Sequence, residues 1–237
     1  MAPARIAMTD RTLALALDPA TLTALRASGF HLYAFRPVTS SNKSGAPLVW
    51  GRVDSYLQSI SLNFTSTALA AFLSTDSIAV DRPIDVGASI AVATGQIVAV
   101  SKSGTLSATS GAPTGDVYIA SGANVAYVAG LAAAFNGLPM VPFCAFDLYP
   151  QVTVTMQPAD AIFVMWATST YDPAVYMQRS LGPGLLVAFG GATQRAVSYD
   201  ITKGWQAGGA AWAMPVASGA DLAATLILDP GSNHPLA

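Results

Sequence analysis

The sequence predicts an all-β fold, an antiparallel β-sandwich or flattened barrel, with one short helix near residues 19–28. The chain has no glutamate and only three lysines beside eight arginines, so it lacks the two residues that clothe solvent-facing helices. Apolar residues alternate with small or polar ones through most of the chain, which is the period of a strand. Turn residues recur at spacings of about ten residues, as in sandwiches and barrels. No polar linker interrupts this pattern, so we expect one domain over residues 1–237.

The first two elements are predicted by alternation and by capping residues. Residues 11–17 place every second leucine on one face, which indicates a half-buried strand. Asp18 is suited to cap a helix, Pro19 to its first position, and Gly29 to the left-handed position after its end. The chain is therefore expected to enter a helix of about ten residues directly after its first strand.

Period-two alternation returns after residue 29 and predicts strands for most of the remaining chain. Polar turn residues predict loops over 39–47 and 102–116. Residues 124–136 carry apolar residues at helical spacing, but Gly130 and the neighbouring strands favour a strand or irregular structure there. The further predicted strands are 30–35, 48–56, 60–64, 86–101, 117–120, 143–149, 151–156, 161–168, 184–189, 195–201, 209–214 and 222–228.

The composition predicts a neutral surface. Charged residues form 10% of the chain, against about 25% in ordinary soluble domains, and the net charge is −2. Such a surface offers weak electrostatic protection, so we expect self-association into a homo-oligomer. The chain has no basic cluster, which argues against nucleic acid as a partner.

The sequence also bears on location. No apolar run is long enough for a transmembrane helix. The apolar stretch 13–17 is too short for a secretion signal, so the start of the chain predicts no signal peptide. We expect synthesis in the cytoplasm of a bacterium and leave release without a signal open.

Few residues are suited to catalysis or metal binding, so we expect no enzyme, no metal and no cofactor. His31 lies in an aromatic strand, His234 lies in the terminal tail, and Cys144 lies between phenylalanines, where a buried thiol is inert. Ser40 and Lys43 have the spacing of a serine acyl-transferase motif but lie in a turn without its companion motifs. Asp76, Asp81 and Asp85 match no calcium loop and are typical of turns. An enzyme built on aspartates stays open.

Aromatic residues are the main remaining resource for recognition. Trp205 and Trp212 lie in glycine-rich stretches, and Tyr171, Asp172 and Tyr176 lie around a loop. Aromatic rings stack on sugars and also seat in the headgroup layer of membranes. We therefore predict a lectin-like binding protein that contacts a neutral glycan or a lipid headgroup through these five residues.

Two other functions stay open. Residues 86–128 contain only Lys102 and Asp116 as charges, so a hairpin over this range would suit insertion into a membrane by a pore-forming protein. Weakly charged sheet edges and faces would also suit a self-assembling structural protein.

Overall fold

The computed structural model describes residues 10–42 and 44–230. Strands form 53% of the structure and helices 6%, so the predicted all-β fold with a short helix is confirmed. The segment 1–9, used above for the signal-peptide prediction, lies outside the described residues, as do Lys43 and His234. Among the described residues, no helix has the length and apolar character needed to cross a membrane.

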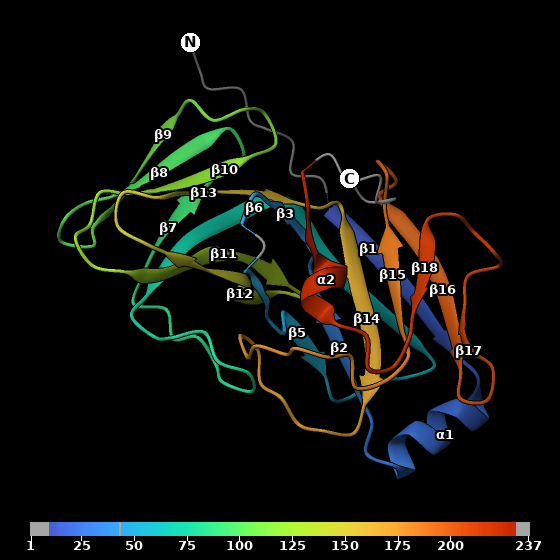
Figure 1. Cartoon of the computed structure of the whole chain (residues 1–237). Coiled ribbons are helices and arrows are strands. Elements are labelled where there is room, and N and C mark those ends of the chain that lie inside the picture. The colour runs from blue at the N-terminus through green and yellow to red at the C-terminus, as the bar shows by residue number, and fades with distance from the viewer. Residues whose placement is uncertain (1–9, 43, 231–237) are drawn as a thin grey trace.

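The strands of the described residues form three sheets, one of which curls into a half-barrel (Figure 1). The eight-stranded sheet runs in the order β17 (Gly204–Gln206), β16 (Gln194–Asp200), β1 (Asp10–Leu17), β6 (Ser59–Ser74), β11 (Tyr127–Phe135), β12 (Leu138–Leu148) and β4 (Ala46–Pro47), with β7 (Ala88–Val92) paired to β6. The six-stranded sheet has the order β19 (Ile227–Leu228), β3 (Val38–Ser40), β13 (Thr153–Pro158), β10 (Val117–Ser121), β8 (Gln96–Val100) and β9 (Leu106–Ser110). The five-stranded sheet has the order β18 (Ala213–Val216), β15 (Gly184–Ala188), β14 (Ala161–Ala167), β2 (His31–Phe35) and β5 (Gly51–Val53).

Most neighbouring strands are antiparallel, as predicted. Three pairs in the described residues are parallel: β1 with β16, β10 with β8, and β19 with β3. The two strands of each of these pairs are well separated in sequence. A tight hairpin can join only antiparallel strands, so parallel strands need a longer connection.

The long strand β6 connects the two ends of the molecule. Its first half, over Ser59–Thr65, pairs with β1, whereas its second half lies between β11 and β7. The strands β7 to β10 consequently gather on one side in Figure 1, and β15 to β18 gather on the other.

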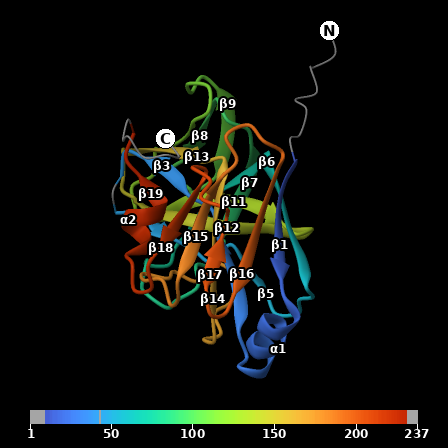
Figure 2. The ribbon, with the colours of Figure 1, turned by 90° about the vertical axis from the view of Figure 1, so that its right-hand side faces the viewer.

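Helix α1 (Pro19–Ala27) forms where the sequence predicts it. The backbone N–H groups of Ala20 and Thr21 donate to Asp18 Oδ1 at 2.8 and 2.9 Å, which satisfies the first turn. Gly29 closes the helix at φ 67°, a conformation that glycine adopts without steric cost. Figure 2 shows the helix at one end of the strands.

Several predicted segments are wrong in part. Strand β3 (Val38–Ser40) extends into the predicted loop 39–47, because it pairs with residues 156–158 and buries Thr39 and Ser40 despite their hydroxyl groups. Residues 106–110 form β9 inside the predicted loop 102–116, because serine and threonine fit a half-exposed edge strand. The predicted strand 48–56 is shortened to β5, and β6 extends the strand predicted over 60–64.

Two further corrections concern the type or continuity of an element. The predicted strand 86–101 is two strands, β7 and β8, in different sheets, because Gly95 turns the chain at φ 88°. The predicted strand 222–228 begins as a helix, α2 (Leu222–Leu226), because Asp221 Oδ1 accepts the Ala224 N–H at 3.0 Å and caps it. The strand favoured over 124–136 is confirmed as β11.

A buried arginine lies where the three sheets meet. Arg36 is 2% exposed and stands in the link between β2 and β3. Its guanidinium carbon lies 5.6 Å from the ring centroid of Trp50, 5.7 Å from Phe64 and 5.3 Å from Phe143. Burial lowers the pKa of Arg36 to about 10, and the charge of Asp160 partly offsets that effect, so the guanidinium stays charged at neutral pH.

Gly130 in β11 provides a test of how closely the eight-stranded sheet is packed. A Cβ atom at this position would lie 2.0 Å from the backbone oxygen of Cys144 and 2.8 Å from the ring of Phe72. We expect Gly130→Ala to lower the free energy of unfolding by about 1–3 kcal/mol, as overpacked cores do. Denaturant unfolding measures this difference.

The matched control is Gly87→Ala, because the nearest atom to a Cβ there is the Leu73 oxygen at 3.6 Å. Its unfolding free energy should stay within about 0.5 kcal/mol of the wild type. Equal stability of the Gly130 and Gly87 variants would contradict the close packing of β11 against β12.

Candidate functional site

A groove beside Trp205 is the largest of the recesses that we describe. Its volume is about 640 Å³, within the range of about 300–1,000 Å³ that is typical of ligand sites. One wall is Trp205 of β17, at the edge of the eight-stranded sheet, and the floor is Leu185 and Pro215 of the five-stranded sheet. The lining residues carry no charge and comprise Leu185, Trp205, Gln206, Ala207, Gly208, Gly209, Ala210, Ala211, Ala213 and Pro215.

A tight turn holds Trp205 at the groove. Asp200 Oδ1 accepts the Thr202 hydroxyl at 2.6 Å, the Thr202 N–H at 2.8 Å and the Lys203 N–H at 3.0 Å. These hydrogen bonds lower the pKa of Asp200 from 3.8 to about 2. The turn brings β17 back against β16 and fixes the start of the groove wall.

The Trp205 ring is the outer member of a row of aromatic rings. It lies 5.0 Å from Tyr199, which lies 6.0 Å from Trp166, which in turn lies 4.8 Å from Tyr56, all measured between ring centroids. The Trp205 indole N–H donates to the Pro183 oxygen at 2.9 Å. Trp205 is therefore a half-buried, oriented wall whose polar atom is already satisfied.

Trp212 lies near this groove without lining it. The Arg195 guanidinium carbon lies 4.8 Å from the centroid of its ring, and Arg195 also donates to the Phe189 oxygen at 2.7 Å. The Trp212 oxygen accepts the Ala188 N–H at 2.8 Å. Trp212 consequently supports the segment that leads from the groove rim into β18.

Tyr171, Asp172 and Tyr176 lie in a different place from the two tryptophans. Arg52 Nη1 donates to the Tyr171 oxygen at 3.0 Å and to Asp172 Oδ1 at 3.2 Å. Tyr176 forms an isolated antiparallel bridge with Leu48. None of the three lines the groove. The structure thus brings Trp205 and Trp212 to one region and the other three predicted residues to another.

A polar cluster around Arg52 was not predicted from the sequence. Asp54 Oδ1 lies 2.7 Å from both Arg52 Nε and His31 Nδ1, and Tyr33 is the cross-strand partner of Arg52. Burial lowers the pKa of Arg52, but its hydrogen bond to Asp54 together with the charges of Asp54, Tyr33 and Asp172 raises the pKa above its usual value. The Tyr33 hydroxyl accepts the Tyr171 N–H at 2.9 Å, and burial raises its pKa. The cluster fastens the 168–176 loop to β2 and β5, and only the pairing of these strands could have predicted it.

The residues considered for chemistry are dispersed. Cys144 is fully buried, and burial raises the pKa of its thiol to about 12. His31 lies beside Asp54, not beside this thiol. Asp76 Oδ2 accepts the Asp85 N–H at 2.7 Å and closes a turn. Within the described residues, no group of three or more histidine, cysteine or acidic side chains is placed to hold a metal ion.

Comparison of this chain with protein-family models, with curated proteins and with solved structures found no match.

The turn at Asp200 predicts a dependence of stability on acid. Because the folded pKa of about 2 lies below the ordinary value of 3.8, the carboxylate stabilises the fold above about pH 4 and this contribution is lost as the pH falls towards 2. Thermal unfolding followed by tryptophan fluorescence should show a steeper fall in Tm between these pH values for the wild type than for Asp200→Ala. Parallel curves for the two proteins would contradict this role of Asp200.

Proposed function

We propose that this protein is a non-enzymatic binding protein that takes a neutral ligand, of the glycan or lipid-headgroup class, in the groove beside Trp205. The observation that carries the proposal is a groove of about 640 Å³ with an oriented tryptophan wall and no charged lining residue. A charged ligand would lose its hydration there without gaining an opposite charge.

The chemistry of the groove favours a saccharide over a purely apolar ligand. The Trp205 ring can stack on the C–H face of a sugar, while the Gln206 amide and the backbone of residues 207–211 provide hydrogen bonds to hydroxyl groups. The zwitterionic headgroup of phosphatidylcholine, which carries no net charge, would use the same ring through a cation–π contact with its ammonium group. An array of neutral glycans and neutral phosphatidylcholine vesicles are therefore the two probes.

The same features support binding rather than catalysis. The groove lining contains no group that titrates near neutral pH, and general acid–base catalysis needs one. The inserting-hairpin alternative has less support, because β7 and β8 have five residues each, whereas a membrane-crossing strand needs about 9–11. Release of a dye from liposomes by the protein would instead support insertion of the 86–128 hairpin into a membrane.

Replacement of Trp205 tests the groove. We expect Trp205→Ala to weaken binding to the array or vesicles about tenfold or more, because the ring supplies most of the apolar contact. Trp205→Phe should retain part of the affinity. Trp212→Ala should weaken binding less strongly, because Trp212 supports the rim without lining the groove.

Tyr171→Phe is the control, because Tyr171 lies outside the groove. Near-ultraviolet circular dichroism of each variant establishes that it is folded. No binding of either probe by folded wild type, or full binding by folded Trp205→Ala, would contradict the proposal.

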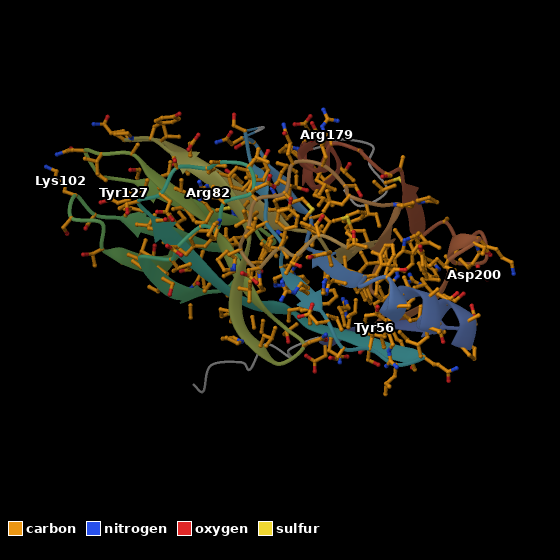
Figure 3. The ribbon with its side chains drawn as sticks, turned by 90° about the horizontal axis from the view of Figure 1, so that it is seen from below. Tyr56, Arg82, Lys102, Tyr127, Arg179 and Asp200 are labelled. Carbon is orange, nitrogen blue, oxygen red and sulfur yellow. The ribbon has the colours of Figure 1, made fainter. Side chains whose placement is uncertain are left out.

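A separate observation supports the expected self-association. Val125, Tyr149 and Val152 are 55%, 56% and 41% exposed, and they lie on two adjacent loops. Tyr127 pairs with Leu148 beside these loops, and the Ser121 N–H donates to the Val152 oxygen at 2.9 Å. Figure 3 shows Tyr127 at the opposite end of the molecule from Asp200, so this apolar patch lies far from the groove. We propose that this patch contacts a second copy of the chain. Because the surface of the chain carries few charges, such a contact buries apolar side chains without burying charged ones.

Light scattering coupled to size exclusion tests this contact. The wild type should show a mass above the 24.3 kDa of one chain, rising with concentration, and Val125→Lys should return it to that mass. Val80→Lys is the matched control, since Val80 is 44% exposed on another loop. A monomeric wild type at every concentration would refute the contact.

A further inference from the structure

A second recess lies on the outer face of the eight-stranded sheet. It has a volume of about 370 Å³ and is bounded by strands β1 and β6 and by the turn between β11 and β12. Unlike the groove, it is lined mainly by hydrogen-bonding side chains. The lining residues are Asp10, Thr12, Asn63, Phe64, Thr65, Ala134 and Gly137.

Two cross-strand pairs orient the polar groups of this recess. Thr12 lies opposite Asn63, and its hydroxyl donates to Asn63 Oδ1 at 2.9 Å. Thr65 lies opposite Asp10, and its hydroxyl donates to Asp10 Oδ1 at 3.1 Å. Each threonine thus occupies one oxygen of its partner. Within residues 10–42 and 44–230, this leaves Asp10 Oδ2 as an acceptor and the Asn63 amide nitrogen as a donor toward a ligand.

The turn between β11 and β12 forms the third side of the recess and holds Asn63 in place. Asn136 and Gly137 have φ values of 49° and 74°, the conformation of a two-residue hairpin turn. Asn136 Oδ1 accepts the Asn63 N–H at 2.6 Å, and the Asn136 N–H donates to the Asn63 oxygen at 2.8 Å. Asn136 therefore holds Asn63 at both its backbone N–H and its backbone oxygen.

We infer that this recess is a second binding site, which takes a pair of neighbouring hydroxyl groups of a neutral saccharide or polyol. One hydroxyl group donates to Asp10 Oδ2, and its neighbour accepts from the Asn63 amide. Ala134 and Gly137 contact the C–H groups between them. A single acidic side chain lines the recess, so it does not form a set of ligands for a divalent cation. The inference stands on hydrogen-bonding geometry and does not require the groove at Trp205.

Isosteric variants separate the chemistry of the site from the stability of the fold. Asp10→Asn keeps an oxygen for Thr65 but loses the charge, and Asn63→Asp keeps an oxygen for Thr12 but loses the amide donor. Binding is measured on an array of immobilised neutral mono- and oligosaccharides, followed by calorimetry with the saccharide that binds best. Ser61→Ala is the matched control, because Ser61 is exposed on the same strand outside the recess.

We expect both isosteric variants to lose about tenfold or more in affinity, as the loss of a hydrogen bond to a charged or buried polar group does. Ser61→Ala and Trp205→Ala should retain binding at this site. A folded wild type that binds no saccharide would overturn the inference, and so would unchanged affinity in Asp10→Asn and Asn63→Asp. Loss of all binding in Trp205→Ala alone would assign the saccharide to the groove and remove the recess as a site.

Discussion

The position of the sheets depends on one buried charge and the rings around it. Arg36 follows directly after β2 of the five-stranded sheet, and the chain enters β3 of the six-stranded sheet two residues later. The guanidinium of Arg36 lies among the rings of Trp50, Phe64 and Phe143. Two of these rings belong to β6 and β12 of the eight-stranded sheet. A buried guanidinium is costly unless its surroundings stabilise the charge, so an arrangement that keeps the rings and Asp160 near Arg36 is favoured.

Both proposed sites follow from this arrangement. The groove exists because β17 of the eight-stranded sheet faces β15 and β18 of the five-stranded sheet, so its width is set by the packing between these sheets. Arg11 adds a second link, since its guanidinium donates to both oxygens of Asp160 at 2.7 and 2.9 Å and ties β1 to the turn before β14. The same strand β1 then presents Asp10 and Thr12 to the recess on its outer face.

The features predicted correctly from the sequence are those that depend on residues close together in the chain. The capping pattern of Asp18, Pro19 and Gly29 placed α1 correctly, because capping depends on neighbours in the chain. Strand β3 was not predicted, because its hydroxyl-bearing residues are typical of a loop. Only its pairing with β13, which is distant in sequence, makes it a buried strand. The Asn136–Gly137 pair is a strong hairpin signal that could have predicted the β11–β12 turn, whereas the pairing of Arg52 with Asp172 depends on a contact distant in sequence. Trp205 was predicted as a ligand-binding residue from its glycine-rich neighbourhood; it lies in β17 beside the groove, and its aromatic neighbours come from three other segments.

A double-mutant cycle between Arg36 and Phe143 measures how strongly the buried guanidinium depends on the rings around it. Arg36→Met replaces the guanidinium with an apolar side chain of similar length, and Phe143→Leu replaces the ring with a non-aromatic one. Denaturant unfolding of the wild type, both single variants and the double variant gives the coupling free energy between the two positions. We expect a coupling free energy of about 1 kcal/mol or more, as for a desolvated cation–π contact. If the changes in unfolding free energy of the two single variants add up to that of the double variant within about 0.3–0.5 kcal/mol, the two residues are not coupled. That result would contradict the stabilisation of Arg36 by the rings around it.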